Sequence, residues 1–343
     1  MAEKEIRVRY AALVDAVSRV LAREGVTEAV RWVEADLMAE ADLLGVPSHG
    51  VRMLPGLVQA IRDGRCNSAP ELTILRERGA ICVCDCDHGP GRHTAVQAMS
   101  HAMERARRFG VGVCLAVKTT HWGRAHAYAR RAAEAGMIGL CTTNAIPNML
   151  AWGSSLPLLG NNPLAIAAPR GAGREPIVLD MAMSQAAVGK IGTYLREGKP
   201  VPPGWGLDAS GRPTSDAAAI LECGKLLPFG DHKGAGLAFM MELLTGVLAG
   251  APLSPEIVQS DSSGLDRGAT KLFLALDIGA FVDRERFGQR VEELIALIQA
   301  IEPGLSISLP GERGGRTRER YLAEGIPIHA DIMASLRAID FPL

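Results

Sequence analysis

Apolar residues in the first part of the chain recur at the three- and four-residue spacing of helices. They predict helices over residues 7–23 and 28–44, followed by a third apolar segment from Leu54 to Ile61. The second helix must stop at Gly45-Val46-Pro47. Ser48-His49-Gly50 therefore falls on a turn between two apolar segments, where side chains can reach a ligand.

The middle of the chain alternates between short apolar runs typical of strands and longer runs at helical spacing. Strands are predicted over residues 72–87, 111–117, 137–143, 163–168, 177–179 and 271–277. Helices are predicted over residues 96–109, 123–135, 234–248 and 284–301, and again from Thr317 onward. This alternation predicts an α/β core with helices on the faces of a sheet. The Pro- and Gly-rich residues 198–216 predict a long surface loop.

Composition narrows the class of protein. The chain has 343 residues, of which 48% are hydrophobic and 22% charged, and its net charge is -1. This balance argues against nucleic acid or an anionic membrane surface as a partner. No apolar run approaches the roughly 18 to 20 residues of a membrane span, and the first residues are too polar for a signal peptide. We therefore expect a cytoplasmic protein, with a helical domain over 1–75 plus 315–343 and an α/β region over 76–314.

Seven cysteines in a chain of this size indicate reduced thiols rather than a disulfide framework. Cys82, Cys84 and Cys86 alternate, so a strand would carry all three on one face. Three thiolates with His88 as a fourth ligand would suit zinc, but structural zinc sites usually use Cys-x2-4-Cys pairs. We favour buried, inert cysteines over this zinc site.

The sequence lacks the familiar nucleotide and hydrolase motifs. Gly89/Gly91, Gly110/Gly112 and Gly171/Gly173 each begin the Gly-x-Gly-x-x-Gly pattern, and none completes it. A Walker loop and a Gly-x-Ser-x-Gly elbow are also missing. The chemistry must therefore come from other residues.

Histidines and acids follow several of the predicted strands. His121 comes after strand 111–117, beyond the carboxyl end, where α/β proteins bind ligands. Asp180 ends the apolar run 177–179, and a histidine is the usual catalytic partner of such a carboxylate. Structural roles are the alternatives: His121 as a residue at a helix N-terminus, Asp180 as the cap of a helix over 182–197, and Ser48 as the cap of the following helix.

Two basic segments suit an anionic ligand. Lys233 precedes helix 234–248, and a cation there opposes the helix dipole unless it faces an anion such as a cofactor phosphate. The loop Gly311–Arg316 carries two guanidinium groups among glycines, a combination suited to phosphate or carboxylate recognition. A solvated lysine and a flexible basic loop are the respective alternatives.

Taken in order, these segments resemble the malate/L-lactate dehydrogenase-like family of NAD(P)-dependent oxidoreductases, which includes ureidoglycolate and sulfolactate dehydrogenases, 2,3-diketogulonate reductase and piperideine/pyrroline-2-carboxylate reductases. The matching segments are Ser48-His49-Gly50-Val51, His121-Trp122-Gly123, Gly160-Asn161-Asn162-Pro163-Leu164, Leu179–Ser184 with Gly189-Lys190, His232-Lys233-Gly234 with Glu242-Leu243-Leu244, and Pro310-Gly311-Glu312-Arg313. Together they extend from residue 48 to residue 313.

The resemblance implies a mixed-sheet, non-Rossmann NAD(P)-binding domain with helical N- and C-terminal segments packed together. It also implies a homodimer with active sites near the subunit interface, and a small substrate that carries a carboxylate. The implied reaction interconverts a 2-oxo acid and a 2-hydroxy acid, with NAD against NADP left open and no metal required. The alternative is reduction of a cyclic imine, Δ1-pyrroline-2-carboxylate or Δ1-piperideine-2-carboxylate, because the run Leu227–Gly234 looks similar to that branch.

Carried over by position, His49 would be the acid/base residue, held by Asp180 and accompanied by Ser48. His121 would lie in the same site and is the acid/base residue in some members, and Asn162 would support the substrate pocket. Residues implied at the cofactor are Met181, Ala182, Ser184, His232, Lys233, Gly234, Gly311, Glu312 and Arg313.

One position departs from the family pattern. Members commonly have an arginine three residues after the Ser-His-Gly glycine, where it pairs with the substrate carboxylate, and this chain has Met53 there. Arg52 is one residue earlier, a rotation of about 100° on a helix, so it is a candidate for the substrate site but need not face the pocket. We therefore expect Arg124 to grip the carboxylate and Met53 to make the pocket more apolar.

Overall fold

The computed structural model describes residues 5–257, 265–301 and 307–343. Its centre is a seven-stranded open sheet with the strand order β2-β3-β4-β10-β5-β8-β9. The strands are β2 (Thr73–Arg78), β3 (Ile81–Asp85), β4 (Val111–Val117), β5 (Met137–Thr143), β8 (Leu164–Ala168), β9 (Ile177–Met181) and β10 (Lys271–Asp277). Within it β3 and β4 run parallel, and the other neighbours are antiparallel. The prediction of a mixed α/β sheet is thus confirmed.

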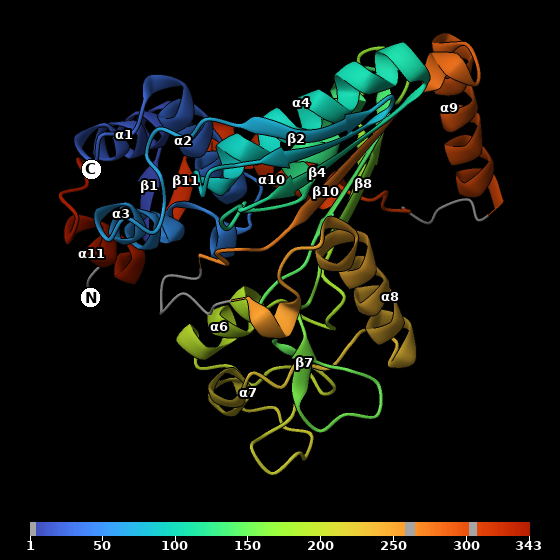
Figure 1. Ribbon diagram of the computed structural model, residues 1–343. Helices are drawn as coiled ribbons and strands as arrows, with labels where there is room; N and C mark the ends of the chain where they lie inside the picture. Colours follow the sequence, from blue (N-terminus) through green and yellow to red (C-terminus); the bar gives the residue numbers. More distant parts are fainter. Residues whose placement is uncertain (1–4, 258–264, 302–306) are drawn as a thin grey trace.

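Two helices cover one face of this sheet, as Figure 1 shows for α4. α4 (Gly91–Phe109) packs on β4 and β10, and α5 (His126–Glu134) packs on β5 and β8. Small side chains make this possible, because a Cβ on Gly112 would lie 1.8 Å from the carbonyl oxygen of Ala102 in α4. α4 begins five residues before the predicted start and α5 three residues after it.

The two ends of the chain build a separate helical core. α1 (Tyr10–Arg23), α2 (Glu28–Leu43) and α3 (Leu54–Arg62) pack with α11 (Ala330–Arg337), and Figure 1 shows both termini on this side of the molecule. β1 (Glu5–Val8) pairs antiparallel with β11 (Ile326–His329) within it. The first two helices were predicted correctly. The division into domains at residues 75 and 315 stays a prediction.

Some elements differ from the predictions. The run 72–87 is a hairpin of two strands, because Gly79 adopts a positive φ of 54° at the turn. The chain is not helical throughout from Thr317, because Gly325, with φ 86°, ends α10 and the next four residues pair with β1. The expected surface loop 198–216 buries Val201 and Trp205 in a third apolar cluster, so part of it is core.

This third cluster belongs to the lower part of the molecule in Figure 1. Its elements are β6 (Met149–Leu150), β7 (Pro157–Leu159), α6 (Val188–Arg196), α7 (Ala217–Cys223) and α8 (His232–Glu242), with the π-helical turn η3 (Leu243–Val247) directly after α8. The other helices are η4 (Ser254–Glu256), η5 (Ile278–Ala280), α9 (Arg284–Ile301) and α10 (Glu312–Glu324). None of the described helices is both long enough and apolar enough to span a membrane.

Candidate functional site

A buried carboxylate shapes the Ser48-His49-Gly50 turn. After α2 the chain forms two short 3-10 turns, η1 (Pro47–His49) and η2 (Val51–Met53). The Oδ2 atom of Asp42 accepts a hydrogen bond of 2.8 Å from the backbone N–H of Val51. A Cβ on Gly50 would lie 2.2 Å from the carboxyl group of Asp42, so only glycine fits beside this anchor. Asp42 therefore anchors the turn to α2.

A buried ion pair supports the same turn from α4. The Nη1 atom of Arg92 lies 3.1 Å from Glu34 Oε2, and both side chains are almost completely buried. Arg92 also donates through Nη2 to the backbone oxygen of His49 at 3.0 Å. Breaking a buried pair leaves an uncompensated charge, which costs about 3–5 kcal/mol. The position of His49 thus depends on charges that α2 and α4 bury together.

The structure brings the two predicted acid/base residues together. The rings of His49 and His121 stack with centroids 5.8 Å apart and an interplanar angle of 21°. The Nδ1 atom of His49 lies 2.8 Å from the hydroxyl oxygen of Ser48. Ser48 is thus a partner of His49. A Cβ on Gly189 of α6 would lie 2.2 Å from the Cβ of Ser48. The turn is closed by α6 on that side.

One ring nitrogen of His121 is fixed by a hydrogen bond from the backbone. Its Nδ1 accepts a hydrogen bond of 3.2 Å from the backbone N–H of Gly123. The ring proton of a neutral imidazole must then sit on Nε2, which lies 4.0 Å from Oδ2 of Asp266. Burial, followed by the neighbouring His49, lowers the pKa of His121 well below its usual value. His121 is thus a fixed, neutral imidazole.

The expected pairing of Asp180 with His49 is not what the structure shows. Oδ2 of Asp180 accepts from Arg124, at 3.1 Å from Nε and 3.0 Å from Nη2. Asp180 is also no cap for a helix over 182–197, because α6 begins at Val188. The predicted carboxylate and the predicted substrate arginine satisfy each other. The sequence could place Asp180 and Arg124 near the pocket, but it could not show whether Asp180 pairs with His49 or with Arg124.

Without an aspartate at its side, His49 experiences a positive field. Burial, then Arg124, Arg92 and Arg52, lower its pKa to about 3. The imidazole is therefore neutral at pH 7. A bound anion would offset the guanidinium charges and raise this pKa.

Arg52, which need not have faced the pocket on a helix, faces the turn. A 3-10 turn replaces the predicted helical geometry here, and the guanidinium of Arg52 donates through Nη1 to the backbone oxygen of Ser48 at 3.3 Å. No carboxylate of the described residues forms an ion pair with it. Met53 follows in the same turn and is half-buried.

A buried lysine near His121 was not predicted from the sequence. Lys271 is 1% exposed, and its Nζ contacts the hydroxyl of Thr119 and donates to the backbone oxygen of Thr120 at 2.8 Å. Burial lowers its pKa to about 8, while the nearby Asp266 acts in the opposite direction. A charge at the first position of the apolar strand 271–277 was the available signal. Glu34 and Asp42 left a similar signal, because both lie on the buried stripe of α2.

The predicted cofactor segments gather around β9. The backbone N–H of Val178 donates to Pro310 O at 3.2 Å, and a Cβ on Gly311 would lie 3.3 Å from Val178 O. At the other end, a Cβ on Gly234 would lie 2.6 Å from the backbone oxygen of Met183. His232-Lys233-Gly234 and Glu312-Arg313 form the first turns of α8 and α10. Two helix N-termini therefore flank the segment 178–183.

Several other predicted residues have local roles. The Ser184 hydroxyl donates to Ala186 O at 2.8 Å, His232 packs edge-on against Trp152, and Glu312 pairs with Arg316 on the surface. Met181 ends β9 and is half-buried, with Ala182 beside it.

Asn162 is held by buried hydrogen bonds within the protein. Its side chain is fully buried, accepts from Ala145 N at 3.1 Å and donates to Ala238 O and to Glu242 Oε2. The carboxylate of Glu242 also accepts from Asn144 and Ser254. Asn162 thus fixes the segment before β8 to α8, and its expected role in supporting the substrate pocket stays a prediction.

Comparisons with known proteins agree on one family. A family model described as malate/L-lactate dehydrogenase matches residues 8–337. The chain is 35% identical to a malate dehydrogenase of Pyrococcus horikoshii, covering 98% of this chain and 95% of that protein. It is 34% identical to a Delta(1)-pyrroline-2-carboxylate/Delta(1)-piperideine-2-carboxylate reductase of Pseudomonas putida, covering 97% of each. The solved sulfolactate dehydrogenase from Methanocaldococcus jannaschii matches with a TM-score of 0.89 at 33% identity, covering 97% of this chain and 96% of that one.

The Asp42 anchor predicts a pH-dependent difference in stability. Burial raises the pKa of Asp42 from 3.8 to about 7 in the folded protein. Its contribution to stability is therefore complete below pH 4 and is lost as the pH rises through 7. Asp42→Asn keeps an acceptor for Val51 N–H without a charge. Relative to wild type, its free energy of unfolding in urea should improve between pH 5 and pH 8, by on the order of 2 kcal/mol.

The matched control is Asp15→Asn, which alters an exposed carboxylate paired with Arg19. This variant should follow wild type at both pH values, because exposed pairs contribute little. An Asp42→Asn variant whose difference from wild type is the same at pH 5 and pH 8 would show that Asp42 keeps an ordinary pKa in the turn.

Proposed function

The chain belongs to the malate/L-lactate dehydrogenase family and is an oxidoreductase, and from that membership we propose that it interconverts a 2-oxo acid and its 2-hydroxy acid with NAD(P)H. The observation that carries this proposal is the neutral imidazole of His49, held on a rigid turn beside the guanidinium of Arg52. In such a pair the imidazole can exchange a proton with the hydroxyl oxygen of the substrate, while the guanidinium binds the adjacent substrate carboxylate.

The residues around β9 suit a dinucleotide. The first turn of α10 offers backbone N–H groups, and Lys233 and Arg313 offer positive charge for phosphate groups. Gly234 and Gly311 allow close approach of the backbone at both positions. Met181 and Ala182 would complete the wall between them. A bound nicotinamide supplies or accepts the hydride, while the protein provides position and a proton.

His49 carries the proton in this scheme. In the tautomer that this step needs, Nδ1–H donates to the hydroxyl oxygen of Ser48, which leaves the lone pair of Nε2 for the proton of the substrate hydroxyl. In the direction of oxidation the neutral ring accepts that proton. In the direction of reduction the bound carboxylate first offsets the field of Arg124, Arg92 and Arg52, so that the ring can carry a proton to donate. His121 stays neutral and fixes the ring of His49 by stacking.

Arg52 is our choice for the substrate carboxylate, in place of Arg124. The Arg124 guanidinium already pairs with Asp180, whereas that of Arg52 donates to one backbone oxygen. Arg124 then acts at a distance, by adding to the positive field at His49.

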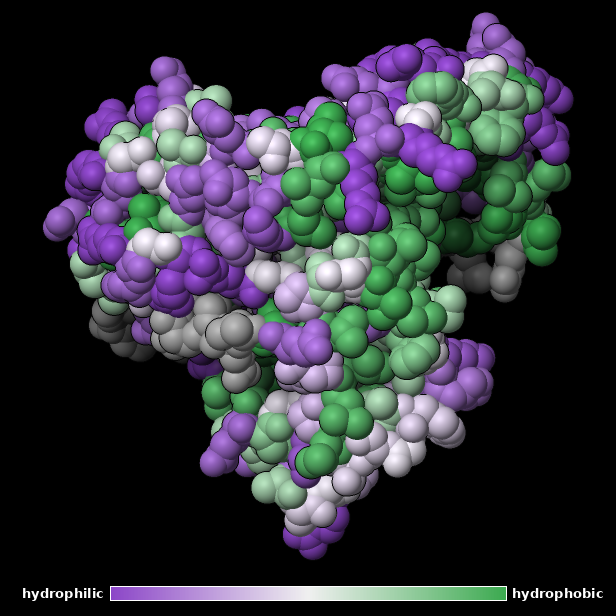
Figure 2. All heavy atoms as spheres, viewed as in Figure 1, coloured by the Kyte–Doolittle hydropathy of each residue, from purple (hydrophilic) through white to green (hydrophobic). Residues whose placement is uncertain are grey.

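We also propose that the enzyme works as a homodimer in the cytoplasm. α8 and η3 expose a row of large apolar side chains, and Figure 2 shows apolar atoms gathered over this part of the molecule. They are Leu237, Phe239, Met240, Leu244, Val247 and Leu248. Patches of this kind mark protein interfaces, and a second copy would cover it beside the cofactor segments. Seven unpaired cysteines suit a reducing compartment.

Reduction of a cyclic imino acid is the second candidate. The run Leu227–Gly234, which resembles the imine-reducing branch, packs directly on the proposed cofactor wall, with Gln185 N donating to Leu227 O at 2.8 Å. The Pseudomonas putida relative is named for this activity. His49 would then deliver its proton to the imine nitrogen, and Arg52 would hold the same carboxylate.

A substrate panel tests the proposed activity. Purified protein is mixed with NADH or NADPH and with pyruvate, oxaloacetate, larger 2-oxo acids, Δ1-pyrroline-2-carboxylate or Δ1-piperideine-2-carboxylate. We expect the absorbance of reduced nicotinamide to fall with at least one 2-oxo acid, faster than with either imine. Faster turnover of an imine would select the second candidate, and inactivity with every compound would reject both.

The assignment of Arg52 predicts a difference between two arginine variants. Arg52→Ala should raise KM for the preferred substrate by roughly tenfold or more, because a hydrogen bond to a charged group is worth about 1.5–3 kcal/mol. Arg124→Ala should change kcat more than KM, because it alters the field at His49. Arg19→Ala, at a distant exposed pair, should change neither. A large increase in KM for Arg124→Ala with none for Arg52→Ala would restore Arg124 as the carboxylate partner.

A further inference from the structure

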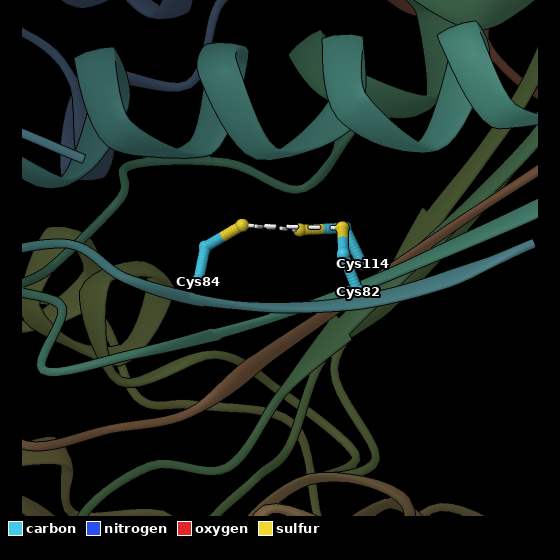
Figure 3. Close-up of side chains that lie close together, drawn as sticks. All are labelled: Cys82, Cys84 and Cys114. Atoms are coloured by element: carbon cyan, nitrogen blue, oxygen red, sulfur yellow. Dashed lines mark hydrogen bonds between the residues drawn. The ribbon is translucent and has the colours of Figure 1, made fainter. Parts of the chain in front are cut away.

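Three cysteine sulfurs meet beneath α4, away from the proton-transfer site. Cys82 and Cys84 belong to β3, and Cys114 lies opposite Cys82 on the parallel strand β4. Figure 3 shows all three side chains on the face of the sheet toward the helix. Cys114 Sγ lies 3.5 Å from Cys84 Sγ, which lies 3.9 Å from Cys82 Sγ, and all three are fully buried.

This set differs from the one that the sequence suggested. Cys82, Cys84 and Cys86 do lie on one buried face, as predicted. Cys114 joins the first two through the pairing of β3 with β4, whereas Cys86 and His88 lie outside the group. Sequence spacing could not reveal a ligand contributed by a neighbouring strand.

The spacing of the sulfurs fits a metal ion without movement of the backbone. A thiolate sulfur binds such ions at about 2.3 Å, so three sulfurs around one ion lie about 4.0 Å apart. The ligand atoms of the three cysteines all lie within 4.8 Å of one another. Among the described residues this cluster has no fourth His, Cys, Asp or Glu ligand. That donor set disfavours tetrahedral zinc and suits a soft ion such as Cu(I).

The surroundings supply charge balance. Arg105 is almost fully buried, donates to Glu77 at 2.6 Å and to His101 O at 3.1 Å, and has a buried Nε without a hydrogen-bond partner. Cysteine binds metal ions as the thiolate, so a buried guanidinium beside the cluster would offset part of the charge of the three ligands.

The cysteine cluster is buried but lies close to an exposed edge of the sheet. β2 is the edge strand of the sheet and is exposed along its whole length, and β3 is its neighbour. The cluster therefore lies one strand in from the edge, where local opening is easiest.

We propose that Cys82, Cys84 and Cys114 form a trigonal thiolate site for a soft monovalent metal ion, Cu(I), which joins β3 to β4 beneath α4. Binding of one Cu(I) releases the thiol protons of the ligands to solvent and leaves copper in the same oxidation state. The bound ion stabilises the folded chain, because the three ligands lie together only when both strands are paired. The site shares no residue with the proposed hydride-transfer site.

Anaerobic titration of the reduced, full-length protein with Cu(I) held by a competing chelator tests this site. We expect one copper per chain after desalting, three sulfur neighbours by X-ray absorption, and a melting temperature that rises with bound copper. Cys114→Ala and, independently, Cys84→Ser should lose the tightly bound copper and the rise in melting temperature.

Two other cysteines serve as matched controls. Cys141→Ala removes a buried thiol from the same face of the sheet, and Cys223→Ala removes the half-buried one. Both should bind copper as wild type does. Circular dichroism and the melting temperature of the metal-free variants show whether each has folded, and the Cys84→Ser result stands if Cys114→Ala does not fold. The proposal would be overturned if a folded cluster variant bound as much copper as wild type, or if the wild-type protein bound zinc more tightly than copper. It would also be overturned if all the copper bound by wild type were lost in Cys223→Ala.

Discussion

The candidate site depends on charges buried beneath one turn. Asp42 binds the backbone of Val51, and the Arg92–Glu34 pair binds the backbone of His49. All three side chains come from α2 and α4, which belong to different cores, so the turn is fixed where those cores meet. Charges in such places are costly unless each is paired or hydrogen-bonded. The protein accepts this cost at the position where a histidine needs a fixed orientation.

The same charges explain the chemistry assigned to His49. Guanidinium groups surround a half-buried imidazole, and the carboxylate expected to balance them is paired with Arg124. Burial, with these charges adding to it, keeps the ring neutral. In the proposed scheme a substrate carboxylate does more than anchor the molecule, because its negative charge raises the pKa of the ring. Proton transfer is in this way tied to binding of an acid, which all the proposed substrates are.

Sequence reasoning succeeded where a pattern is local. The spacing of Val30, Leu37 and Ala41 predicted α2, and the ordered motifs placed His49 and His121 in one site, as their stacked rings show. It failed where several partners compete in space. Asp180 had both Arg124 and His49 within its expected surroundings, and only the fold decides which of them it meets.

Short pairings and buried acids were missed for related reasons. Residues 326–329 are too few to show a strand pattern. They form β11 by pairing with β1, which lies at the opposite end of the chain, so local spacing could not reveal this strand. Asp42 and Glu34 lie on the buried stripe of a predicted amphipathic helix. In the sequence an acid at such a position is only a break in the apolar pattern, because its partner is not known. Asn162 matched a motif, yet its hydrogen bonds to Ala238 and Glu242 show a structural role.

The most direct test of the account compares His49→Gln with His121→Gln in kcat/KM for the best substrate of the panel. His49→Gln should lower kcat/KM by about 10²- to 10⁴-fold, the usual contribution of general acid–base catalysis. His121→Gln should lose clearly less, because His121 accepts from Gly123 through Nδ1 and its ring stacks on that of His49. Binding of NADH or NADPH, followed by fluorescence, shows that each variant keeps its cofactor site. A greater loss in His121→Gln than in His49→Gln would contradict the assignment of the proton to the Ser48-His49-Gly50 turn.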